Sequence, residues 1–272
     1  LFTPNLDRLH PEFLGHYCRT PGFQDQVISR GTTNYAAIRP SHVLDYTIPL
    51  PRLEEQQRIV GSINRLATKL NEAKALRRRS AEECEQLCRA MLRDERFGPL
   101  TPTPMRELVT WRRPDVEVVP TETYQFAGVY CFGRGVFRGQ RRTGLEFAYR
   151  QLTRLRSGEF VYPKLMAWEG ALGIVPADCD GHFVSPEFPV FTVHEDRVLP
   201  EVLDVYFRSP VVWPSLGGAS TGTNVRRRRL NPKEFLNYQF PLPSRPQQLA
   251  LRAVRLKMSE LKTLQNQSAQ LD

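Results

Sequence analysis

An internal repeat constrains this chain more than any other feature of its sequence. The thirteen residues LHPEFLGHYCRTP at positions 9–21 reappear as VLPEVLDVYFRSP at positions 198–210, and seven of the thirteen are identical or nearly so. The segment IPLP at 48–51 likewise returns as FPLP at 240–243. A spacing of about 190 residues is too long for a solenoid and suits tandem copies of a whole domain. We therefore expect two related domains, the first present only as its last fifty residues.

A long helix is expected after the first copy. Between residues 54 and 93 there is no proline and one glycine, and apolar residues recur at steps of three and four. This pattern is typical of a helix that packs along one seam. The seam residues are Ile59, Ile63, Leu66, Leu70 and Leu87. Because the basic run 77–79 interrupts the seam, we expect packing at the two ends and a looser middle. At 1.5 Å per residue the rod would measure roughly 60 Å.

A second amphipathic helix follows the second copy and begins near Gln247. Two helices from a duplicated chain most simply pair with each other, and antiparallel pairing is favoured because a complete domain separates them.

The region between the helices is rich in Gly, Pro, aromatic and β-branched residues, which indicates a mixed domain with much β-structure. Candidate strands lie at 124–129, 158–163, 173–175, 182–184 and 190–193, and candidate helices at 12–18 and 200–208. The expected fold class is α+β: a β-rich mixed domain plus long helices that form an antiparallel coiled-coil spacer. The expected boundaries are 1–51 for the remnant of the first domain, 52–98 for the first spacer helix, 99–243 for the complete domain and 244–272 for the second spacer helix.

No group of residues points to catalysis. The five histidines have no metal-ligand spacing, the five cysteines include no Cys-x-x-Cys pair, and the glycine-containing run 131–139 lacks the Lys-Ser/Thr pair of a phosphate-binding loop. We expect no metal, no cofactor and no enzymatic activity in this chain. The sequence shows no spanning apolar stretch and no signal peptide, which favours the cytoplasm and argues against a membrane partner.

Basic residues form two clusters in the β-rich domain. The chain carries 38 Lys+Arg against 29 Asp+Glu, a net charge of +9 that favours a polyanionic partner. One cluster lies between 134 and 164, among aromatic residues, and the other is the run 226–229 after a Thr/Asn-containing loop. Arg can grip a phosphate or bridge O6 and N7 of guanine, and Thr and Asn donate to phosphates. A solvated charged face is the alternative interpretation. Trp168 is either a stacking or wedge residue or, as is commoner, part of the core.

The residues expected to contact DNA share these two clusters. They are Arg138, Arg141, Arg142, Lys164, Thr221, Thr223, Asn224, Arg226, Arg227, Arg228 and Arg229.

Four segments resemble the specificity subunits of type I restriction-modification systems. They are 48–60, with its Pro-Leu-Pro turn and Glu-Gln-rich helix start, 158–176, 180–191 and 222–230. The resemblance covers nearly the whole chain and accounts for the internal repeat. The chain departs from the family in lacking most of the first target-recognition domain, and in having Ser-Arg-Pro-Gln-Gln at 244–248 where the first copy has the Arg-Leu-Glu-Glu-Gln-Gln of 52–57.

The resemblance implies a non-catalytic subunit that reads a bipartite DNA target, with the paired helices as a ruler between half-sites. Its implied partners are double-stranded DNA and methyltransferase (modification) subunits. A restriction subunit and a second copy of the chain, joined through the spacer helices, are further candidates. The alternative from another class is a coiled-coil protein-interaction module with a basic surface and no sequence-specific DNA readout.

Overall fold

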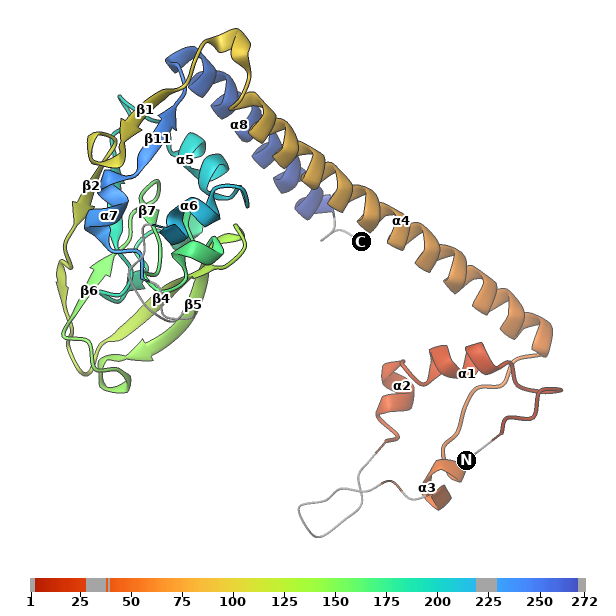
Figure 1. Cartoon of the computed structure of the whole chain (residues 1–272). Helices are drawn as coiled ribbons and strands as arrows, with labels where there is room; N and C mark the ends of the chain where they lie inside the picture. Colours follow the sequence, from red (N-terminus) through yellow and green to blue (C-terminus); the bar gives the residue numbers. More distant parts are fainter. Residues whose placement is uncertain (1–2, 28–37, 39, 219–228, 269–272) are drawn as a thin grey trace. The chain divides into compact units, whose positions relative to one another are not determined.

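A computed structural model describes residues 3–27, 38, 40–218 and 229–268 (Figure 1). Among the residues expected at DNA, those outside the described ranges are Thr221, Thr223, Asn224, Arg226, Arg227 and Arg228. The chain divides into two compact units, Leu1–Ala81 and Glu82–Asp272. No helix in the described ranges is long and apolar enough to cross a bilayer.

The described part of the first unit is helical. Its elements are α1 (Pro11–Tyr17), α2 (Pro21–Gln24), α3 (Pro40–Leu44) and the first part of α4 (Leu53–Met91). The three short helices each begin with a proline, which is favoured in a first helical turn because its φ is already helical and its missing N–H has no partner to lose. Helix α1 corresponds to the helix predicted at 12–18, and its Phe13 is buried.

The strands of the second unit form three small sheets within the described residues. The first pairs β1 (Thr101–Pro104) with β11 (Gln239–Leu242). The second has the order β2 (Val109–Arg112), β10 (Val190–Val193), β7 (Phe160–Val161) and β8 (Gly173–Ile174). The third has the order β3 (Val116–Glu117), β6 (Gln151–Arg154), β9 (Phe183–Val184), β4 (Thr123–Tyr130) and β5 (Gly135–Thr143). All neighbours are antiparallel except β4 and β9. The five predicted strands are confirmed as β4, β7, β8, β9 and β10.

The helices of the second unit, besides the end of α4, are α5 (Pro200–Phe207), α6 (Trp213–Gly218), α7 (Pro232–Asn237) and α8 (Arg245–Ser268). Short 3-10 helices are η1 (Glu95–Phe97), η2 (Met105–Glu107), η3 (Gly144–Glu146), η4 (Ala167–Glu169) and η5 (Ala177–Cys179). Helix α5 confirms the prediction at 200–208. A capping box starts α7: the side chain of Asn231 accepts from the third helical N–H, and Glu234 accepts from the Asn231 N–H at 3.0 Å.

An aromatic core joins the four-stranded sheet to α5 and α7. Phe160, Tyr162, Phe191, Phe207 and Phe235 are fully buried, and the rings of Phe160 and Phe235 stack with centroids 5.3 Å apart. Burial of one such side chain stabilises the fold by roughly 1.5–3 kcal/mol, so this cluster holds α5 and α7 against the four-stranded sheet. Together with the helices, these sheets confirm the expected α+β class.

The repeat extends to the hydrogen bonds of two glutamines, one in each unit. In the first unit, Oε1 of Gln56 accepts from the backbone N–H of His10 at 2.8 Å. Its Nε2 donates to the carbonyls of Arg8 and Pro51, each at 2.8 Å. Gln56 has no exposed surface, so its side chain fastens the start of α4 to the segment before α1.

In the second unit Gln248 makes the corresponding three bonds. Its Oε1 accepts from the N–H of Leu199 at 2.9 Å, and its Nε2 donates to the carbonyls of Arg197 at 3.1 Å and Pro243 at 3.0 Å. The side chain is 2% exposed. Each glutamine thus stands at the same position of its copy and holds the same three backbone groups. We call these two arrangements the glutamine clamps.

Helix α8 runs antiparallel to the C-terminal part of α4 (Figure 1). Near the start of α8, Nε2 of Gln247 donates to the carbonyl of Met91 at 2.7 Å. Farther along α8, Arg255 forms an ion pair of 2.6 Å with Glu85. Residues later in α8 therefore contact residues earlier in α4, which confirms the predicted antiparallel pairing.

A charged pair and a sulfur contact lie between these two helices. Arg255 bonds Asp204 of α5 at 2.5 Å as well as Glu85. Burial lowers the pKa of Arg255, but the two carboxylates outweigh it and raise that pKa overall. Beside them, Sγ of the buried Cys88 lies 3.7 Å from Sδ of Met258. These contacts hold α4 and α8 together and join α8 to α5 of the β-rich domain.

The middle of α4 is exposed on all sides from residue 64 to residue 83, as the interrupted seam predicted. Of the predicted seam, Ile59 and Ile63 are half-buried, whereas Leu66 and Leu70 are 67% and 54% exposed. Of the seam predicted near the end of α4, Leu87 is 52% exposed, whereas the neighbouring Cys88 is fully buried and contacts Met258 of α8. A straight helix drifts by about 20° per heptad from a 3.5-residue repeat, which over four heptads moves the buried stripe by one residue.

Candidate nucleic-acid interface

Strand β5 carries the exposed arginines predicted at DNA. Arg138, Arg141 and Arg142 all lie on this strand, which is the outer strand of the five-stranded sheet in the described residues. None of the three forms an ion pair with a described residue. The guanidinium groups of Arg138 and Arg141 are therefore available to a polyanion without displacement of a carboxylate, whereas the charge of Arg142 also acts on Glu146.

A β-bulge brings two of these arginines to one face of the β4–β5 ribbon. Arg138 pairs with Ala127 and Arg141 pairs with Gln125, so three steps on β5 match two steps on β4. Directly paired residues lie on the same face, and the extra residue therefore places Arg138 and Arg141 side by side on one face. The bulge includes Gly139, where a Cβ atom would lie 3.0 Å from the carbonyl oxygen of Phe126.

Gln125 holds this arrangement together. Its Oε1 accepts from Nε of Arg141 at 3.0 Å, and its Nε2 donates to the carbonyl of Gly139 at 2.6 Å. The terminal nitrogens of Arg141 remain free to form the two-pronged contact that guanine or a phosphate accepts. On the other face, Arg142 donates to Oε1 of Gln140 at 3.4 Å, a weaker contact.

Lys164 and Arg229 occupy a different place and share one carboxylate. Nζ of Lys164 donates to the carbonyl of Pro186 at 2.9 Å and lies 3.5 Å from Oε1 of Glu187, while Arg229 pairs with Oε2 of the same glutamate. The N–H of Leu230 donates to the carbonyl of Lys164 at 2.8 Å. The structure therefore separates these two cations from the β5 arginines, and both already have an anionic partner.

Sequence reasoning did not select the aromatic residues that accompany the arginines. The rings of Tyr130 and Phe137 stack at 3.8 Å between centroids, and the guanidinium of Arg134 lies 4.6 Å above the Tyr130 ring. The alternation of basic and aromatic residues in the sequence was the available signal for them. Trp168, in contrast, is half-buried and its indole N–H donates to the carbonyl of Leu165 at 2.9 Å, which fits a structural role.

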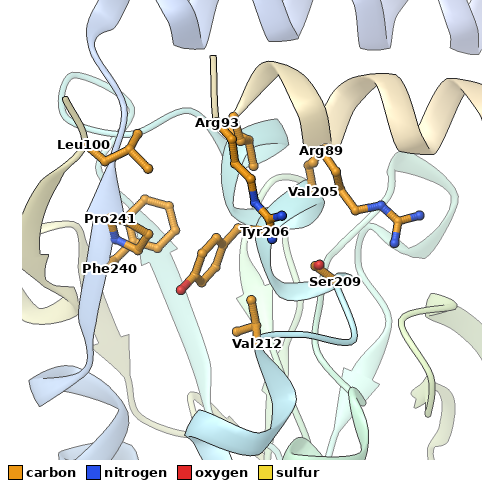
Figure 2. Close-up of a pocket in the computed structure, with 10 residues that line it drawn as sticks. Arg89, Arg93, Leu100, Val205, Tyr206, Ser209, Val212, Phe240 and Pro241 are labelled. Carbon is orange, nitrogen blue, oxygen red and sulfur yellow. The ribbon is translucent and has the colours of Figure 1, made fainter. Parts of the chain in front are cut away.

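A small pocket of about 110 Å³ lies where α4 ends, next to α5 and β11 (Figure 2). Val205, Val212 and Phe240 give it an apolar lining, and Arg89 near the end of α4 and Arg93 just after α4 also line it. Its lining contains no paired acid and base. Among residues 3–27, 38, 40–218 and 229–268, no group of three His, Cys, Asp or Glu side chains is placed to hold a metal ion.

Comparison with known proteins bears on the fold. No protein-family model matches the chain, and no curated protein sequence matches it. A chain from a structure on complex assembly and conformational transition of the type I restriction-modification system matches with a TM-score of 0.57 and 19% identity, over 98% of this chain and 68% of that one. This protein has the fold of that type I restriction-modification chain.

A second match is the HsdS subunit from Thermoanaerobacter tengcongensis, with a TM-score of 0.45 and 22% identity, over 96% of this chain and 66% of that one. The chain thus spans about two thirds of the length of the structures that it matches.

Proposed function

We propose that this chain is the DNA-reading, non-catalytic subunit of a type I restriction-modification complex. The observation that carries the proposal is the row of exposed arginines on β5 that form no ion pair with a described residue, in a chain whose fold matches a type I restriction-modification chain. The four segments that resemble specificity subunits support the same assignment. Methyltransferase subunits, and a restriction subunit with them, would supply the chemistry.

Strands β4 and β5 form a long antiparallel pair at the edge of the five-stranded sheet, which suits them to the major groove. A two-stranded β-ribbon fits the major groove of B-DNA, where each base pair presents a distinct set of donors and acceptors. Arg138 and Arg141 on one face, with Gln125 between them, provide side chains suited to guanine and adenine edges. Arg142 on the opposite face would contact a phosphate. Lys164 and Arg229 would contribute only after exchanging Glu187 for a phosphate.

The helices provide the second part of the proposal. The exposed Leu66 and Leu70, about one helical turn apart, give α4 an apolar strip that is open to a partner helix. A methyltransferase subunit and a second copy of this chain are the two candidates for it. The molecular mass of the purified chain in solution, measured alone and with the methyltransferase subunit, separates these candidates.

Selection from a random duplex library tests the function directly. The chain is incubated with the library at near-physiological salt, alone and mixed with the methyltransferase subunit, and bound DNA is sequenced. Enrichment of a short motif, single or split, is expected. Salt-sensitive binding without enrichment in either mixture would contradict the proposal and favour the alternative, a coiled-coil interaction module with a basic surface.

A further inference from the structure

The turn between β4 and β5 presents an exposed aromatic side chain in an unusual backbone conformation. Phe132 is 66% exposed, and its φ of 63° is the only positive φ of a non-glycine residue in the described part of the chain. An L-residue with a large side chain rarely adopts this region, because Cβ crowds the backbone. Such strain persists only where the surrounding structure holds it in place, and it is concentrated at functional positions.

Contacts outside the hairpin hold the turn. The N–H of Phe132 donates to the carbonyl of Glu169 at 2.8 Å, and the N–H of Gly133 donates to the carbonyl of Gly170 at 3.0 Å. Gly133 also has a positive φ, and a Cβ atom there would meet the carbonyl oxygen of Arg208 at 2.7 Å. The tip is thus fixed to η4 and to the end of α5 instead of moving as a free loop.

The ring of Phe132 is held from one side only. Its centroid lies 6.3 Å from that of Trp213, in a tilted arrangement, and most of its surface remains in contact with solvent. A ring whose only role was to cover Trp213 would bury more apolar surface if it lay flat against the indole. The geometry therefore keeps an apolar group projecting from a rigid support.

Two arginines follow this apolar tip along the chain, and Glu169 interacts with Cys131 at the start of the turn. Arg134, two residues farther along the turn, is exposed and lies over the Tyr130 ring, and Arg138 follows on β5. Neither forms an ion pair with a described residue. An exposed apolar group followed by arginines that form no ion pair in the described ranges suits a ligand with anionic edges and an apolar interior. Duplex DNA has this character, with phosphates outside and stacked bases inside.

We propose that Phe132 is a wedge that enters between adjacent base pairs of a duplex bound along the β4–β5 ribbon. This inference rests on the proposed DNA-binding function. Apolar side chains that separate a base step kink the duplex and increase the surface it shares with the protein. A rigid backbone suits this role, because the ring must keep its position while the two base pairs are unstacked.

The test uses the target found by selection, with 2-aminopurine placed in turn at each position. Unstacking of the probe raises its fluorescence, and we expect one position at which the wild-type chain produces this rise. Phe132→Ala should abolish the rise and lower affinity for the intact duplex about tenfold, whereas Phe132→Leu should retain both. Leu145→Ala, which changes a 78% exposed leucine just after β5, is the matched control and should behave as wild type.

A second measurement separates a wedge from a structural role. An abasic site at the sensitive step removes the stacking that must be broken, so it should restore the affinity of Phe132→Ala to within about twofold of wild type. A rise that persists in Phe132→Ala, or an affinity loss that the abasic site does not rescue, would overturn the wedge. Loss of methyltransferase binding with unchanged DNA signals would overturn it in favour of a protein contact. Failure of the wild-type chain to select any motif would instead refute the DNA-reading function itself.

Discussion

Removal of Arg138 and Arg141 tests the DNA-binding face that we propose for the β4–β5 ribbon. Both side chains are exposed on an outer strand, and neither has an acidic partner among the described residues. The double variant Arg138→Ala, Arg141→Ala should therefore fold as wild type does. The one bond lost is that from Arg141 to Gln125, and an exposed hydrogen bond of this kind changes the free energy of unfolding by no more than about 1 kcal/mol.

The expected effect on binding follows from counterion release. Each phosphate contact contributes about 0.9 to the slope of log K against the logarithm of salt concentration. If both arginines contact phosphates, the slope should fall by about 1.8 in the double variant. Over a fourfold rise in salt, the wild type should then lose about twelvefold more affinity than the variant does. If one arginine reads a base, the slope falls by less and the preference at one position relaxes.

Fluorescence anisotropy with a labelled duplex, at salt concentrations from about 50 to 200 mM, measures this slope. The matched control is Arg113→Ala, because Arg113 is also exposed but lies 3.9 Å over the Trp111 ring and outside the ribbon. An unchanged slope in the double variant, with unfolding also unchanged, would refute the assignment of this face. A fall half as large in the control, which removes one charge against two, would show that only the total charge matters.

Three further predictions follow from other parts of the chain. Gln248→Ala removes three buried hydrogen bonds and should lower the free energy of unfolding by about 3 kcal/mol in urea titrations. Gln239→Ala, at an exposed glutamine, is the neutral control. A loss below about 1 kcal/mol in Gln248→Ala would contradict the stabilising role of the glutamine clamp. A seven-residue helical insertion after Ala75, in the exposed part of α4, lengthens the helix by about 10.5 Å. It should therefore widen the gap of a split DNA target by about three base pairs. An unchanged gap would disprove the hypothesis that helix length sets the spacing of the half-sites. Burial raises the pKa of the Cys88 thiol and so lowers its thiolate fraction at any given pH. Iodoacetamide at mildly alkaline pH should therefore alkylate the more exposed Cys84 before Cys88. Equal alkylation rates of the two thiols, measured by mass spectrometry, would contradict this.

Features set by local pattern could be predicted from the sequence. The Pro-flanked, apolar segment at 200–208 and its earlier counterpart predicted α5 and α1. Apolar steps of three and four predicted the long helices, and the basic run 77–79 predicted the exposed middle of α4. Strand β5 was not predicted, since its nine residues include two glycines and three arginines and few β-formers. It forms a strand because β4 offers it a long antiparallel partner, which is a tertiary effect.

The candidate site depended on register and on distant partners, which no local pattern contains. The sequence placed Arg138 and Arg141 in one cluster, but only the bulge opposite Phe126 shows that they share a face. It also grouped Lys164 with them, although Glu187, which is 23 residues away, pairs with that lysine. The residues of the strained turn gave no signal, because a positive φ at a phenylalanine is imposed by its surroundings and not by its own preference.

The pairing of β1 with β11 makes the whole β-rich domain a cassette. Thr101, where the chain enters the domain, lies opposite Leu242, where it leaves, so the two crossings form one narrow neck. Just beyond that neck, Gln247 joins the beginning of α8 to the end of α4. Everything between the two strands is thus an insertion into a helical hairpin, and another domain with the same paired ends could replace it without rethreading the chain. The β-rich domain could therefore be exchanged while the pairing of α4 with α8 is kept.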